Sequence, residues 1–171
     1  MLYLRNLNVR WYEVKLSDLK AMPFEEHELE QYSVRRGAVL ICEGGHGIGR
    51  AAAWNSDDTV MFQKALHQVR LTGGFYEPEL FVHFLHLSEA SRPITKYYTD
   101  AGIPHLTDDS IQEMPIPLPL LAEQATIVAR VETLLGSSRL LAAELAASRT
   151  HAAHPLQAVL KSAFIPTAWT F

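Results

Sequence analysis

Apolar and polar side chains alternate over short stretches in the first half of the chain, and this pattern predicts short strands. Residues 2–9 alternate with one slip, which indicates a strand with a bulge. The apolar run at 38–42 is typical of a buried strand, and residues 51–54 predict another short one. In the segment 60–71 the later part alternates clearly and predicts a further strand.

Helical signals lie between and after these strands. Pro23 suits the first position of a short helix, and the acidic residues 25–26 suit its positively polarised N-terminal end. A helix with one apolar face is predicted over about 78–87, followed by a second helix over about 88–98. Thr107 is the expected N-cap of a further short helical turn.

The proline-rich segment 114–119 is predicted to be an extended connector, because proline fits neither a helix interior nor a central strand. After it, residues 121–149 contain no proline, one glycine and many strong helix formers. These residues predict a helix of about 45 Å at about 1.5 Å per residue. Pro155 is expected to break or restart this helix before a second short apolar face at 156–164.

Apolar or small side chains recur along the long helix in heptads. One core position holds Ile127, Leu134, Leu141 and Ser148, and the other holds Val131, Ser138, Leu145 and Ala152. A helix cannot cover such a stripe by itself, so a second helix must lie beside it. We therefore expect a partner helix, from another chain or from the missing part of a longer one, to contact Ile127, Val131, Leu134, Leu141 and Leu145.

Together these elements predict an α+β fold in two parts. Residues 1–119 are expected to form a mixed, strand-rich head with flanking helices. Residues 120–171 are expected to form a coiled-coil-type helical region.

Composition and charge fit a globular protein but set a condition on its partners. Apolar residues make up 48% of the 171 residues and charged residues 20%, which is ordinary for a soluble domain. The net charge is −4, and residues 1–119 carry 11 Lys/Arg against 16 Asp/Glu. DNA-binding proteins are usually basic, so any DNA contact must be local, or a basic partner must supply most of the phosphate binding.

Cysteine usage and hydropathy indicate the compartment. Cys42 is the only cysteine, which excludes a disulfide framework within the chain and favours a reducing environment. No apolar run has the length of a membrane span, and the N-terminus lacks the pattern of a signal peptide. We therefore expect a cytoplasmic protein without a membrane span.

Candidate DNA contacts come from loops and polar strand faces. The glycine-dense segment 44–50 lacks the residue order of phosphate-binding loops and is expected to be a tight turn between strands, from which His46 and Arg50 could still contact DNA. The other candidates are Arg35, Arg36, Lys64, Gln68, Arg70, Arg92 and Lys96. For these side chains an ordinary solvated polar face is the alternative interpretation.

The sequence offers no catalytic constellation. His83 and His86, like His151 and His154, have a spacing that can bind a metal, but neither pair has a nearby cysteine or an obvious third ligand. Cys42 lies inside an apolar strand and is predicted to be a core residue. We therefore expect no enzyme activity, no metal and no cofactor.

The junction between the head and the long helix resembles that of a known family. Residues 116–128 are IPLPLLAEQATIV, in which a proline-rich connector leads into Glu123-Gln124 and then Ile127-Val128 at the start of the helix. This arrangement resembles the junction in the specificity subunits of type I restriction–modification enzymes, where a target-recognition domain joins a helical spacer.

The rest of the chain agrees with this order. Gly37-Ala-Val-Leu stands where the family often has Gly-Asp-Val-Leu, Gly49-Arg50 ends the glycine loop, and residues 156–164 resemble the family's terminal Leu…Ile-Leu…Ala-Phe segment. There are two departures. Ala38 replaces the common acidic residue, and the family's recognition domain normally begins well before a Tyr-Leu-Arg strand such as residues 3–5, so the chain is similar to an N-terminally truncated member.

The resemblance implies a non-catalytic subunit that recognises a bipartite target in double-stranded DNA. Its implied partners are methyltransferase (M) subunits, which bring S-adenosylmethionine chemistry, and restriction (R) subunits, which bring ATP-driven translocation. The chain holds one recognition domain where the full subunit has two. The resemblance therefore implies a homodimer, or pairing with another helical spacer, through the long helix, so that the helical pair sets the distance between two readers.

Two alternatives stay open. In the first alternative, the chain is a coiled-coil oligomerisation or scaffold protein, or a remnant fragment, without independent DNA binding. The acidic head favours this alternative. A small enzyme is the other alternative, and a deep pocket with convergent ionisable groups would support it.

Overall fold

The computed structural model describes the backbone of residues 1–99 and 102–164, and the side chains of these residues up to 149 except that of His46. The chain divides into two compact units, Met1–Val128 and Ala129–Phe171. Helix α4 (Leu121–Phe164) begins in the first unit and continues into the second.

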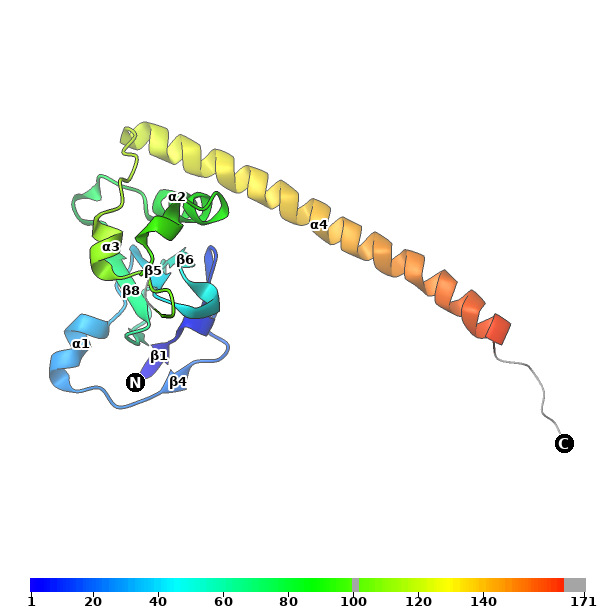
Figure 1. The fold of residues 1–171 in the computed structure, drawn as a ribbon, viewed down its shortest axis with the longest axis horizontal. Helices are drawn as coiled ribbons and strands as arrows, with labels where there is room; N and C mark the ends of the chain where they lie inside the picture. The colour runs from blue at the N-terminus through cyan, green and yellow to red at the C-terminus, as the bar shows by residue number, and fades with distance from the viewer. Residues whose placement is uncertain (100–101, 165–171) are drawn as a thin grey trace. The chain divides into compact units, whose positions relative to one another are not determined.

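A three-stranded antiparallel sheet with the order β6-β5-β8 lies at the centre of the first unit (Figure 1). β5 (Ala38–Cys42) is buried along its whole length, as its apolar sequence predicts. β6 (Ala51–Ala53) and β8 (Leu66–Arg70) pair with it on either side. Because side chains alternate across a strand, β5 contributes to two cores, Leu40 and Cys42 to one and Val39 and Ile41 to the other.

The first core is covered by a second small sheet and a short helix. β1 (Leu2–Leu4) pairs antiparallel with β4 (Lys20–Ala21) and parallel with β7 (Met61–Phe62). Leu4 of β1 is fully buried in this core. The last residue of α1 (Glu26–Tyr32) packs against the same core, with its ring centroid 5.6 Å from that of Phe62.

The second core is covered by helices. Phe81 and Leu85 of α2 (Pro78–Ala90) are fully buried on the other face of the β6-β5-β8 sheet. The 3₁₀ helix Pro93–Tyr97 and α3 (Asp108–Gln112) complete this layer. Thr107 caps α3 through its hydroxyl, which accepts a hydrogen bond from the Ser110 amide, as the sequence predicts.

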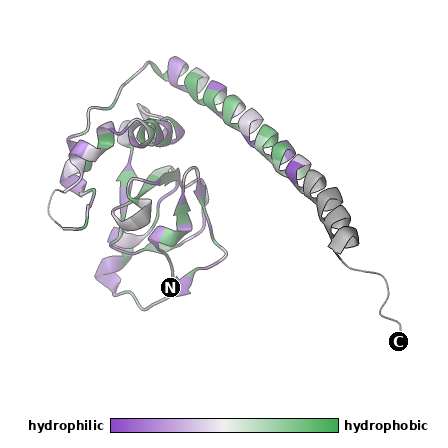
Figure 2. Ribbon diagram, turned by 45° about the vertical axis from the view of Figure 1, so that its right-hand side comes forward, coloured by the Kyte–Doolittle hydropathy of each residue, from purple (hydrophilic) through white to green (hydrophobic). Residues whose placement is uncertain are grey.

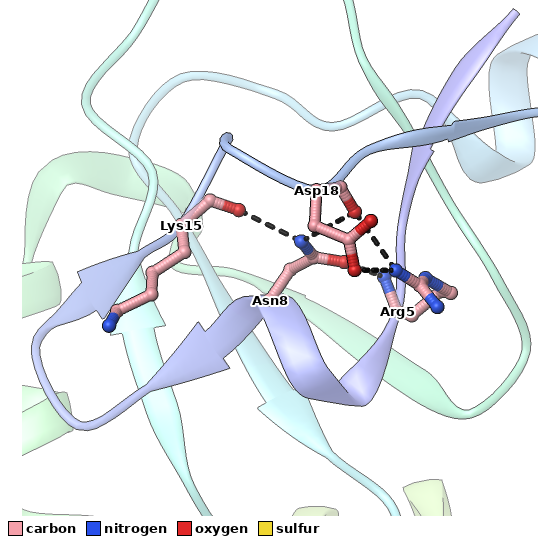
Figure 3. Close-up of polar contacts among 4 residues, drawn as sticks. All are labelled: Arg5, Asn8, Lys15 and Asp18. Atoms are coloured by element: carbon pink, nitrogen blue, oxygen red, sulfur yellow. Dashed lines mark hydrogen bonds and ion pairs between the residues drawn. The ribbon is translucent and has the colours of Figure 1, made fainter.

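The expected strand over 2–9 is only partly correct. The slip in its alternation is not a bulge but a 3₁₀ helix, Asn6–Asn8, and the chain then forms the hairpin of β2 (Val9–Arg10) and β3 (Glu13–Val14). The 3₁₀ helix forms here because the side chain of the buried Asn8 binds neighbouring backbone groups (Figure 3).

The polar contacts of this turn join two stretches of chain. The Asn8 amide accepts from the Arg5 backbone N–H and donates to the carbonyl oxygens of Lys15 and Asp18. The Arg5 guanidinium donates to the Asp18 carboxylate at 2.6 Å and to the Asp18 carbonyl at 2.9 Å (Figure 3). These bonds hold the segment between β3 and β4 against the turn.

Two helix predictions are wrong in their bounds. The expected second helix over 88–98 is absent, because α2 continues to Ala90 and Arg92 then adopts a left-handed conformation, with φ of +74°, before Pro93 starts the 3₁₀ helix. α1 starts at Glu26 rather than at Pro23, because Glu25 forms a capping box with Glu28.

The long helix is also longer than expected. Pro155 neither breaks nor restarts it, since α4 is continuous from Leu121 to Phe164. A proline inside a helix removes one N–H donor and crowds the preceding turn, but a long helix can absorb this as a local distortion. The connector 115–120 has no regular secondary structure, as its prolines predict.

Along the part of α4 up to residue 149, hydrophobic and hydrophilic residues are interspersed (Figure 2). The large apolar side chains of the heptad stripe are exposed at Ile127, Leu134, Leu141 and Leu145, and Val131 is half-buried. The described stripe is therefore not covered by other described residues of this chain. The strand-rich head followed by a long helix confirms the α+β class.

We expect Leu40→Ala to lower the free energy of unfolding by about 2–5 kcal/mol, because it leaves a cavity in a fully buried strand. Leu87→Ala is the matched control, since Leu87 is exposed on α2 and its loss is expected to change stability by less than about 0.5 kcal/mol. Urea titrations followed by circular dichroism measure both values, and equal losses in the two variants contradict the assignment of β5 as the centre of the core.

Candidate nucleic-acid interface

Charged side chains of the head gather at the open edge of β8. The strand order leaves β8 unpaired on one side, and a cavity of about 380 Å³ lies there. Its charged lining residues are Glu43, Lys64, His67, Arg70 and Asp108. The cavity thus brings together two sequence candidates, Lys64 and Arg70, and both are exposed.

Gln68 also lines this cavity, but its amide is engaged in a structural contact. Its Oε1 accepts from the Arg35 backbone N–H at 2.7 Å, and its Nε2 donates to the Ser33 carbonyl at 3.1 Å. These two bonds fasten the segment after α1 to β8. The contact explains this glutamine without any DNA, so Gln68 is a weaker candidate for base reading than its neighbours.

His67 is a part of the site that sequence reasoning missed. Its side chain is only 10% exposed, with Nδ1 2.6 Å from the Asp108 carboxylate and Nε2 2.7 Å from the Leu106 carbonyl oxygen. Both neighbours are hydrogen-bond acceptors. The ring therefore links β8 to α3 in the wall of the cavity.

A second group of cations lies around the glycine loop. The loop contains the 3₁₀ helix Gly45–Gly47 and joins β5 to β6, which confirms the expected turn between strands. A Cβ atom on Gly44 would lie 2.8 Å from the His105 ring, and one on Gly49 would lie 3.2 Å from the Tyr98 hydroxyl. Close packing against the segment before α3 therefore explains these two glycines.

Arg50 and Arg10 flank this loop. The Tyr12 amide donates to the Ala51 carbonyl at 3.1 Å, which brings the β2–β3 hairpin next to β6. The Arg50 side chain lies over Gly47, and no carboxylate among the described residues forms an ion pair with either arginine. Arg10 was not a sequence candidate, because nothing in the local sequence indicates that the hairpin carrying it packs beside β6. The side chain of His46 lies outside the described residues.

The two arginines also act on the thiol beneath the loop. Cys42 is buried, and burial raises the pKa of its thiol from 9.0 to about 12, against a smaller lowering by Arg50 and Arg10. The thiol also contacts the Asn6 carbonyl at 3.7 Å. The predicted core position of Cys42 is thus confirmed.

The remaining candidates do not line the cavity. Arg36 pairs with Asp57 at 2.6 Å, and both side chains are exposed, so this pair contributes little stability. Arg35 and Arg92 are exposed, and the Lys96 ammonium lies 4.9 Å from the centre of the Tyr97 ring. None of these four cations is a lining residue of the β8 cavity.

The histidines of α2 belong to an aromatic cluster. His86 stacks on Trp11 with ring centroids 4.5 Å apart and lies 2.6 Å from the Tyr12 hydroxyl. His83 packs beside Tyr12, with ring centroids 5.1 Å apart. Within the described part of the chain, no three His, Cys, Asp or Glu side chains are grouped as metal ligands. His151 and His154 lie outside the described side chains.

A membrane-spanning helix was not expected, and none of the described helices combines the length and the apolar character needed to cross a bilayer.

Comparisons with known proteins give a family match. A family model described as "Type I restriction modification DNA specificity domain" matches residues 6–147, which confirms the resemblance found at the junction. No curated protein matches the sequence. One similar solved structure comes from work on complex assembly and conformational transition of the type I R-M system, with 21% identity and a TM-score of 0.76.

Another similar structure is the HsdS subunit from Thermoanaerobacter tengcongensis, with 21% identity and a TM-score of 0.67. At this identity the two structures support the fold alone. Each alignment covers 99% of this chain and 44% of the other, so the chain spans less than half the length of either structure.

We expect the buried thiol to make stability fall at high pH. Unfolded, the Cys42 thiol ionises near its ordinary pKa of 9.0, whereas in the folded protein it ionises only near 12. Its contribution is therefore complete below about pH 9 and is lost as the pH rises toward about 12. Urea titrations from about pH 8 to pH 11 are expected to show a steeper loss for the wild type than for Cys42→Ala. Parallel profiles for the two proteins would contradict this prediction.

Proposed function

Because this chain belongs to the family of type I restriction modification DNA specificity domains, we propose that it is a non-catalytic reader of DNA sequence that directs methyltransferase and restriction subunits to a bipartite target. The observation that carries the proposal is the extent of the match. It covers the head and the first part of α4 together, which are the two parts that a reader attached to a spacer needs.

A bipartite target needs two readers at a fixed separation, and this chain has one head. The second head is supplied by a second copy of the chain or by the rest of a longer protein. The exposed stripe on α4 supports such a pairing, because Leu134, Leu141 and Leu145 leave apolar surface in water. An antiparallel helical pair places the two heads apart, as a two-reader protein requires.

The open edge of β8 is the surface that we propose faces DNA. Lys64 and Arg70 are exposed there beside His67. Lysine and arginine bind phosphate oxygens and the acceptor edge of guanine in the major groove. The acidic head limits non-specific attraction to DNA, so the partner subunits supply much of the phosphate binding.

The second candidate function is a scaffold that pairs through α4 without reading DNA. The excess of carboxylates in the head favours it, because a repulsive field lowers affinity for any duplex. The same purified complex decides between the two candidates, since only a reader selects particular sequences from a random pool.

We expect the chain, with its partner methyltransferase subunits, to enrich particular sequences from a random-sequence DNA pool. On an enriched duplex, Lys64→Ala and Arg70→Ala are each expected to weaken binding by about 1–3 kcal/mol where the native side chain contacts a base. Where it contacts a phosphate, the slope of log affinity against log salt concentration is expected to fall in magnitude by about one. Lys20→Ala is the control, because Lys20 is exposed in β4 and is not a lining residue of the β8 cavity. Absence of any sequence preference in the wild-type complex refutes the reader and leaves the scaffold.

We expect Leu134→Glu and Leu141→Glu to disrupt self-association through α4, because each places a charge in an apolar helical seam. Ala143→Glu introduces the same side chain at an exposed position outside the two heptad core positions and is the control. Sedimentation velocity over a concentration series is expected to give a lighter species for the two leucine variants only. Identical sedimentation of all the proteins would contradict pairing through this stripe.

A further inference from the structure

Gln124 is an unusual residue for the start of an exposed helix. Among residues 121–149 of α4 it is the only buried one, with 0% of its surface exposed. A buried amide is costly unless its oxygen and its nitrogen both find partners. The partners of Gln124 therefore explain why a polar side chain occupies this position.

All of these partners are backbone groups of the head. The Gln124 Oε1 accepts from the Glu77 N–H at 2.8 Å, while its Nε2 donates to the Phe75 carbonyl at 2.8 Å and to the Pro119 carbonyl at 2.9 Å. Glu77 is the N-cap of α2, so the contact reaches the helix that covers the second core. One side chain thus connects the start of α2, the end of the proline connector and the first turn of α4.

The neighbouring residue, Glu123, has a different structural role. The Glu123 carboxylate accepts from the Leu120 N–H at 3.0 Å, and the Glu123 N–H donates to the Leu120 carbonyl at 2.8 Å. This reciprocal pair caps the first turn of α4, and among the described residues the Glu123 carboxylate forms no hydrogen bond or ion pair with another head segment. Glu123 therefore starts the helix, whereas Gln124 attaches it.

The leucines beside this junction leave much of their side-chain surface in solvent. Leu118, Leu120 and Leu121 are all exposed, although they stand next to the point of attachment. The described contacts that hold the first turn to the segment 75–77 are the hydrogen bonds of Gln124. Removing a buried amide from such a place breaks the attachment without emptying a core.

We propose that Gln124 is the positioning residue that fixes where the spacer helix begins on the head, and that it thereby sets how strictly the protein measures the distance between its two half-sites. The second clause rests on the proposed function; the first does not. A reader held firmly at the start of its spacer tolerates one separation of half-sites, whereas a loosely held reader tolerates several.

The attachment itself is tested by amide hydrogen exchange of the full chain. Gln124→Met keeps a similar volume but removes all three hydrogen bonds, so the Glu77 amide is expected to exchange at least about tenfold faster than in the wild type. Gln112→Ala is the control, because Gln112 is exposed on α3. Unchanged protection of the Glu77 amide in Gln124→Met overturns the attachment.

A second pair of variants removes one bond from the other side, in case Gln124→Met does not fold. Glu77 has φ of −75°, which proline also adopts, so Glu77→Pro deletes the N–H donor and leaves Gln124 in place. Glu77→Ala is its matched control, because it removes the same carboxylate and keeps the N–H. Protection of the amides of the first turn of α4 is expected to fall in Glu77→Pro only, and equal protection in both variants counts against the attachment.

Spacing is tested with the partner methyltransferase and duplexes carrying the two half-sites enriched by the wild type. Inserting or deleting one base pair between the half-sites is expected to weaken wild-type binding strongly. In Gln124→Met, the ratio of the affinity for the best spacing to the affinity for the neighbouring spacings is expected to fall about tenfold. Affinity for a single half-site is expected to stay unchanged. A variant with a lost Glu77 contact and an unchanged spacing profile overturns the inference and leaves the reader intact, whereas a wild type without sequence preference refutes the reader.

Discussion

β5 is buried on both faces, and this constraint organises the rest of the head. A strand of five apolar residues cannot face water on either side, so one layer must cover Leu40 and Cys42 and another must cover Val39 and Ile41. The chain supplies the β4-β1-β7 sheet for the first layer and α2 for the second. Charged side chains are then excluded from both cores; Lys64 and Arg70 line the cavity at the edge of β8, and Arg50 lies beside the glycine loop.

The parts of the fold that local patterns determine were predictable from the sequence. The apolar run of β5, the apolar face of α2 and the hydroxyl cap at Thr107 each depend on residues within a few positions of one another. The 3₁₀ helix Asn6–Asn8 was missed because its cause, the bonds from Asn8 to Lys15 and Asp18, comes from the next turn of chain.

The candidate sites were less predictable, because their geometry joins distant segments. His67 contacts Asp108, which lies 41 positions later in the sequence, and the residues around neither side chain predict this contact. The hairpin that carries Arg10 is joined to β6 by the bond from the Tyr12 amide to the Ala51 carbonyl, across about forty positions of sequence. Conversely, Gln68 was a candidate DNA contact because it lies on the polar face of an alternating strand, yet its amide binds the backbone of the segment 33–35. Alternation in the sequence predicts on which face of a strand a side chain lies, but not which group it contacts.

α4 separates two kinds of interaction along its sequence. Its large apolar side chains are exposed and suited to another helix, while its one buried described residue, Gln124, is polar and binds the head. Hydrophobic contact is non-directional, so a junction made only of leucines could slide or repack. Three hydrogen bonds to fixed backbone groups require one arrangement, because each donor and acceptor must be aligned. Directional contacts thus fix the start of α4, whereas apolar side chains are exposed further along it, and this division matches the order of polar and apolar residues from Gln124 to Leu145.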